Sequence, residues 1–116
     1  MAIITQKEPF TKEQVEKLLG EFPEYIKTVI DIDKKICSAG ANRHFESEEA
    51  LIKQGSKQND LWGGGVDVET KEINIDSMIN IRPALDNRSN QIQDPAIREK
   101  FEELTRYFFP TIFNEA

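Results

Sequence analysis

Two segments of this chain carry apolar residues at every second position, and this alternation constrains the fold more than any other feature of the sequence. The first segment spans 25–32, and a turn near Asp33–Lys34 leads into a short second strand, so we expect a β-hairpin. The second begins at Leu61, turns near Thr70–Lys71 and continues to residue 81. It predicts a second hairpin whose inward side chains are Ile73, Ile75, Ile79 and Ile81.

Three further segments have helical spacing and residues typical of helix ends. The expected N-caps are Thr11, Ser47 and Asp94. The expected stops are Pro23, Gly55 and Pro110. Amphipathic helices and two hairpins together predict one α+β domain over 1–116, in which the hairpins form an antiparallel sheet and the helices pack on one of its faces.

The net charge of −6 disfavours broad binding to long nucleic acids or to anionic membranes. The chain lacks the charged and then apolar start of a signal peptide, and it lacks a run of about 18 apolar residues that could span a membrane. We therefore expect a cytoplasmic, acidic protein. Cys37 and His44 are single in the sequence, which excludes an internal disulfide and a zinc site made of four Cys and His ligands, and we expect neither metal nor cofactor.

The alternation at 73–81 assigns the neighbouring side chains to the other face of the sheet. Those side chains are Asn74, Asp76, Met78, Asn80 and Arg82. Two interpretations remain open. The row is either the solvated face that antiparallel sheets normally have, or a shallow binding face bordered by the loop at 83–94.

Arginines favour the binding interpretation, because four of the five lie from Arg82 onward and most lysines lie before that point. A guanidinium offers a planar fork of donors suited to carboxylate or phosphate. Arg82 and Arg88 are therefore candidate anion anchors, with Asn80, Asn87 and Ser89 as hydrogen-bonding partners. The alternative is that Arg82 pairs with Asp76 or Asp86, and Arg88 with an acidic residue of a helix.

Three other features could contribute to a site. The glycine run after Trp62 indicates a bulge, or a place where the indole packs over the backbone, and Trp62 is either core or a stacking surface for a ligand. His44 is the only side chain with an ordinary pKa suited to proton transfer near neutrality, although a lone histidine is commonly structural. Cys37 is expected to be a small buried apolar residue.

Three stretches, GSKQNDLWG at 55–63, SMINIRP at 77–83 and NRSNQIQDPAIREK at 87–100, give the chain a family resemblance. Together they resemble a family of small uncharacterised bacterial proteins classed as a domain of unknown function. The resemblance covers most of the chain and implies a single-domain bacterial protein. It implies no substrate and no catalytic residue.

Two functions follow as hypotheses. The first is a binding or regulatory module that holds an anionic group of a small ligand or protein partner on the polar sheet face and the 83–94 loop. The second is a small metal-independent phosphoryl-transfer or RNA-cleaving enzyme in which His44 acts with Arg82 and Arg88. The apolar C-terminal segment at 108–113 also suggests a homodimer contact.

Overall fold

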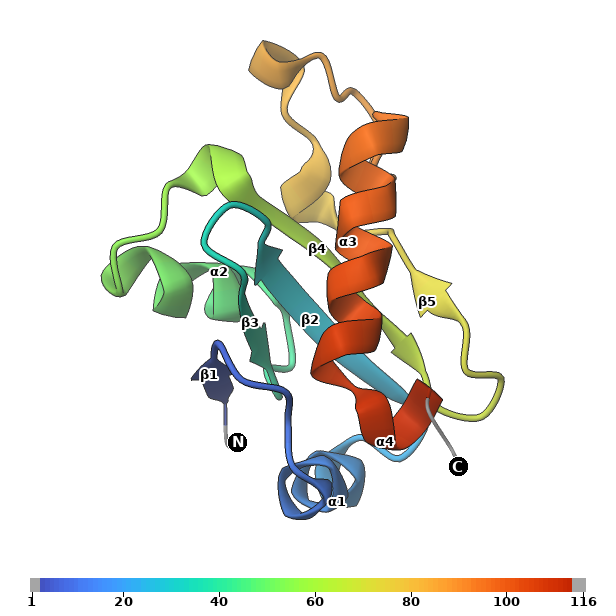
Figure 1. The fold of residues 1–116 in the computed structure, drawn as a ribbon. Helices are drawn as coiled ribbons and strands as arrows, with labels where there is room; N and C mark the ends of the chain where they lie inside the picture. The colour runs from blue at the N-terminus through green and yellow to red at the C-terminus, as the bar shows by residue number, and fades with distance from the viewer. Residues whose placement is uncertain (1–2, 114–116) are drawn as a thin grey trace.

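A computed structural model describes residues 3–113 of the chain. Its centre is a five-stranded antiparallel sheet with the order β1-β3-β2-β4-β5 (Figure 1). The strands are β1 Ile4–Gln6, β2 Tyr25–Asp31, β3 Ile36–Ala39, β4 Leu61–Asp67 and β5 Ile73–Asn74. The expected α+β class, the antiparallel sheet and the first hairpin are confirmed.

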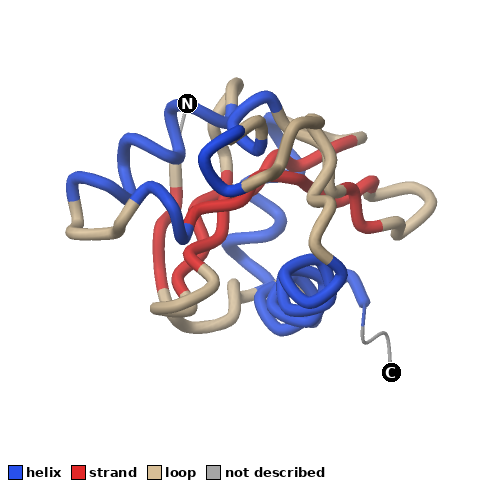
Figure 2. Tube along the Cα trace, turned by 90° about the horizontal axis from the view of Figure 1, so that it is seen from above, coloured by secondary structure: helices blue, strands red, loops and turns tan. Residues whose placement is uncertain are grey.

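Helices lie on both sides of the sheet (Figure 2). The α-helices are α1 Lys12–Glu21, α2 His44–Lys53, α3 Pro95–Phe108 and α4 Pro110–Phe113. Short 3-10 turns are η1 Gln58–Asp60, η2 Met78–Asn80 and η3 Pro83–Leu85. The expectation that helices cover one face is therefore wrong for α2.

The position of α2 follows from Val29 of β2, whose side chain points to the opposite face of the sheet from Ile26 and Ile30. Ile26 and Ile30 point into the larger core with α1, α3 and α4, while Val29 packs with Leu51 of α2 and with Leu61 on the opposite face. Because the pleat alternates side chains, a strand with apolar residues at both parities needs cover on both sides.

The larger core joins the two ends of the described chain. Phe10 packs against Phe108 and Phe109, with ring centres 6.0 and 4.9 Å apart, and its backbone N–H donates to the Phe108 carbonyl over 2.9 Å. Phe108 and Phe109 are fully buried, and Ile112 is nearly so. The expected dimer contact through this segment loses its basis, because these side chains fill the protein's own core.

Two of the expected helix caps are present. The Thr11 side chain accepts from Gln14 N–H while the Gln14 side chain accepts from Thr11 N–H, and Asp94 accepts from Ala96 N–H ahead of Pro95. The third differs, since α2 begins at His44 and Ser47 is buried within its first turns. There the Glu46 side chain accepts from Arg43 N–H over 3.0 Å, which satisfies one of the unpaired N–H groups at the helix start.

The second hairpin is shorter than expected, because β5 ends at Asn74 and the chain then turns into η2. The Ser77 side chain accepts from Ile79 N–H and caps this turn. The turn interrupts the strand alternation and changes which side chains face the core. As a result, Asn80 is fully buried and Ile81 is 40% exposed. The predicted polar sheet face from 74 to 82 is therefore wrong.

Candidate functional site

After β5 the backbone pairs in the isolated bridges Asp76–Gln91 and Arg82–Asn87, and side-chain amides add further hydrogen bonds to this segment. Asn80 Oδ1 accepts from Gly63 N–H over 2.8 Å, and Asn80 Nδ2 lies 2.9 Å from the Gly63 carbonyl, to which it donates. Nδ2 also lies within donating distance of the carbonyls of Ile75 and Asn90. The Asn80 amide thus covers the part of β4 that β5 leaves unpaired.

Asn87 organises the loop that follows. Its Nδ2 lies 2.8 to 3.0 Å from the carbonyls of Asn80, Ser89 and Gln91, and its Oδ1 accepts from Gln93 N–H. The Ser89 hydroxyl accepts from Gln91 N–H over 3.0 Å. Asn80, Asn87 and Ser89 are therefore engaged inside the protein, and the site proposed below does not include them.

The glycine run allows close packing on both faces of β4. A Cβ on Gly64 would lie 2.8 Å from the Phe101 ring, and a Cβ on Gly63 would lie 2.7 Å from Ser77 Cβ. β4 pairs with β2 residue by residue, so the expected bulge is wrong. Trp62 is 2% exposed, which places it in the core.

Arg82 lies between β4 and α2. Its guanidinium donates to the Leu61 carbonyl and to Glu48 Oε2 over 3.1 Å, and it lies 5.2 Å from the centre of the Trp62 ring. Burial lowers the pKa of Arg82, and the Glu48 carboxylate opposes that shift. The alternative interpretation of the sequence paired Arg82 with Asp76 or Asp86. The structure shows Glu48 as its partner instead.

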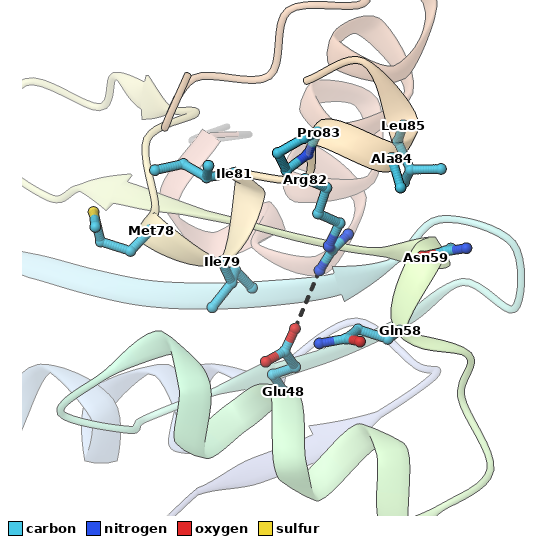
Figure 3. A pocket seen from close by; sticks show the side chains of 10 residues that line it. All are labelled: Glu48, Gln58, Asn59, Met78, Ile79, Ile81, Arg82, Pro83, Ala84 and Leu85. Atoms are coloured by element: carbon cyan, nitrogen blue, oxygen red, sulfur yellow. Dashed lines mark hydrogen bonds and ion pairs between the residues drawn. The ribbon is translucent and has the colours of Figure 1, made fainter. Parts of the chain in front are cut away.

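The Arg82–Glu48 ion pair lines a cavity of about 400 Å³ between α2 and the segment from η2 to η3 (Figure 3). Gln58 and Asn59 stand at one side of it, and apolar side chains stand on the other. Three of those apolar side chains are exposed: Met78 by 75%, Ile81 by 40% and Leu85 by 39%. The cavity combines hydrogen-bonding groups with an apolar rim.

A second cavity of about 260 Å³ lies beside the first turn of α2. Its lining residues are Lys27, Arg43, His44, Phe45, Ser77, Met78 and Ile79. Met78 and Ile79 line both cavities. We call the two cavities together the α2 groove.

His44 lies half-buried in this second cavity. Nε2 lies 2.7 Å from the Gly64 carbonyl, and because a carbonyl only accepts, Nε2 carries the proton. Burial lowers the pKa of His44, the hydrogen bond to Gly64 opposes the shift, and the charge of Lys27 adds to it. A neutral ring leaves Nδ1 as a hydrogen-bond acceptor at pH 7.

The structure brings Arg82 and His44 to one face of the molecule and leaves Arg88 apart. The Arg88 side chain is 68% exposed, pairs with Asp86 over 3.4 Å and lines neither cavity of the groove. Sequence reasoning missed Lys27, Arg43 and Glu48. The spacing of His44 and Glu48 could have indicated Glu48, because residues four apart on a helix face the same side. No comparable local signal pointed to Lys27 or Arg43.

The site therefore belongs to a small α+β domain with a groove between one helix and a turn-rich segment. A family model described as "Protein of unknown function (DUF5674)" matches residues 2–108, and the chain belongs to that family. No curated protein and no solved structure matches it. Within residues 3–113, no helix is long and apolar enough to cross a membrane, and no cluster of three His, Cys, Asp or Glu side chains could hold a metal ion.

Proposed function

We propose that this protein is a binding module that takes a segment of a partner protein into the α2 groove. The observation that carries the proposal is the Arg82–Glu48 pair, which is nearly buried yet lines a cavity whose rim exposes Met78, Ile81 and Leu85. A cluster of exposed apolar side chains around polar groups is typical of interaction sites.

The chemistry of the first cavity suits a polypeptide. Glu48 accepts, Arg82 donates, and the amides of Gln58 and Asn59 do both, which matches the backbone N–H and C=O groups of an extended chain. A free anion would have to displace Glu48 from Arg82 before it could bind there. The rim of Met78, Ile81 and Leu85 offers contact to an apolar side chain, and methionine adapts to many shapes.

The geometry gives less support to the enzyme hypothesis. Arg88 is held by Asp86 outside the groove, and the His44 Nε2 proton is committed to the Gly64 carbonyl. An acid/base role with both arginines needs all three side chains within reach of one reacting group.

A random peptide library displayed on phage tests the proposal directly. Peptides selected on the wild-type protein are expected to lose binding to a Met78→Glu variant, because the new charge would lie against the apolar rim. The Tyr107→Glu variant is the matched control, since Tyr107 is 49% exposed on α3 and lines neither cavity of the groove.

The two variants separate groove binding from adhesion to any exposed apolar side chain. Selected peptides should bind Tyr107→Glu as they bind the wild type. Peptides that bind Met78→Glu equally well, or a library that yields no binder at all, would contradict the proposed function.

A further inference from the structure

We propose that the second cavity of the α2 groove, formed by Lys27, Arg43, His44 and Phe45, binds a carboxylate of the partner segment. This inference rests on the proposed function and adds the class of side chain that the groove selects in the partner segment. It assigns the carboxylate to an acidic side chain of a polypeptide.

Charge is the first argument. The lining of this cavity contains Lys27 and Arg43 and no acidic residue, although the whole chain has a net charge of −6. Lys27 is half-buried, and its ammonium lies 5.7 Å from the centre of the Tyr25 ring. A local cationic cavity on an acidic protein attracts an anionic group selectively.

Helix geometry adds to this charge. The cavity lies at the first turn of α2, where the N-terminal end of a helix carries partial positive charge. Glu46 accepts from the Arg43 backbone N–H, and Glu46 does not line the cavity. The Glu46 carboxylate offsets part of the positive end of α2, and the Arg43 side chain adds its own positive charge to the cavity lining.

The walls of the cavity strengthen the interaction. Phe45 is 48% exposed, and with Met78 and Ile79 it makes most of the lining apolar. Partial exclusion of water raises the strength of an ion pair, so a carboxylate here would be held more firmly than one on an open surface.

One α2 residue of each cavity, Glu48 in the first and His44 in the second, indicates the order of side chains in the partner. His44 and Glu48 lie four residues apart on α2, which puts their Cβ atoms roughly 6 Å from each other. An extended chain rises about 3.3 Å per residue, so this distance spans about two residues. The partner segment therefore carries an apolar side chain for the first cavity and an acidic side chain two residues away for the second.

Phenylacetate is a suitable probe, because it joins a carboxylate to an apolar ring, and phenylacetamide is its neutral counterpart. We expect phenylacetate to shift the backbone amide NMR signals of Lys27, His44 and Ser77, and phenylacetamide to leave them in place. Equal shifts with the two compounds, or no shift with either, would overturn the inference.

Charge-removing variants locate the binding. Lys27→Met and Arg43→Gln should each bind phenylacetate about tenfold more weakly, which corresponds to the loss of one charge-assisted hydrogen bond. Lys53→Met is the matched control, because Lys53 is exposed at the other end of α2 and should leave binding unchanged. An equal loss in Lys53→Met would mean a general charge effect and would overturn the assignment.

The peptide library keeps this inference distinct from the proposed function. If the groove binds a partner segment and the second cavity takes its carboxylate, the selected peptides should be enriched in Asp or Glu two residues from an apolar residue. Selected peptides that lose binding to Met78→Glu and yet show no enrichment in Asp or Glu would support the proposed function. That result would overturn the assignment of a carboxylate to the second cavity.

Discussion

The side-chain amide of Asn80 pairs with the backbone of Gly63 in both directions, accepting from its N–H over 2.8 Å and donating to its carbonyl over 2.9 Å. An asparagine amide has the same donor and acceptor as a peptide group, so it can take the place of a strand residue. Asn80 does so where β5 has ended, and η2, with the groove wall that it carries, is held in place by this pairing.

Replacing Asn80 by alanine is expected to destabilise the fold by about 3 kcal/mol, because the buried N–H and carbonyl of Gly63 would both lose the side-chain amide that pairs with them. Urea unfolding measures the loss. Asn90→Ala is the control, since the Asn90 side chain is exposed and should change stability by less than about 0.5 kcal/mol. Equal stabilities for the two variants would contradict the role given to Asn80.

Gly64→Ala and Gly20→Ala should have opposite effects on stability. A Cβ on Gly64 would lie 2.1 Å from the Asn74 carbonyl oxygen, a backbone atom that can move only if β4 and β5 separate. We expect a cost of about 3 kcal/mol. Gly20 lies in α1 with nothing within 4 Å of an added Cβ, and alanine there should add about 0.5–1 kcal/mol. Thermal unfolding of both variants checks the prediction.

The Arg82–Glu48 pair should show strong coupling in a double-mutant cycle. Arg82→Met leaves Glu48 nearly buried beside an apolar side chain, and we expect a loss of about 2 kcal/mol in the free energy of unfolding. The double variant with Glu48→Met should recover about half of that loss, because no unpaired charge remains. Strictly additive effects would show that the pair is only a surface contact.

His44 makes stability depend on pH in a defined direction. Burial lowers the pKa of His44 in the folded protein, so between that pKa and about 6.5 the unfolded chain binds more protons. The stability that neutral His44 contributes is complete above about pH 6.5 and is lost as the pH falls through the lowered pKa. NMR titration of the single histidine should give a pKa below its ordinary value.

A second measurement isolates this contribution from the titration of carboxylates. The difference in stability between wild type and His44→Gln should shrink as the pH falls below about 6.5 and stay constant above it. A difference that is constant over the whole range, or that grows on acidification, would contradict the lowered pKa.

The sequence predicted those elements whose signals are local. The capping box of Thr11 and Gln14, the Asp94 and Pro95 helix start and the hairpin of β2 and β3 all depend on residues within a few positions of one another. Hydrophobic period also identified the stripe of α3, of which Phe101, Leu104 and Phe108 are buried. These local signals were sufficient to predict the α+β class.

The candidate site could not be predicted in the same way, because long-range hydrogen bonds form it. The isoleucine alternation continued through Ile79 and Ile81, and nothing local marked Ser77 as the point where the strand turns. The bonds of Asn80 to Gly63 and of Arg82 to Glu48 join residues 17 and 34 positions apart. Residue types pointed to Arg82 and His44, while their partners depended on how α2 packs.

The contact of Phe10 with Phe108 and Phe109 has a consequence for biosynthesis. The aromatic centre of the larger core needs residues from both ends of the described chain, so a nascent chain that still lacks α3 exposes the apolar sides of α1 and of the sheet. Completion of this core must wait until α3 and Phe109 have been synthesised, and a product truncated before α3 would be a substrate for chaperones and proteases.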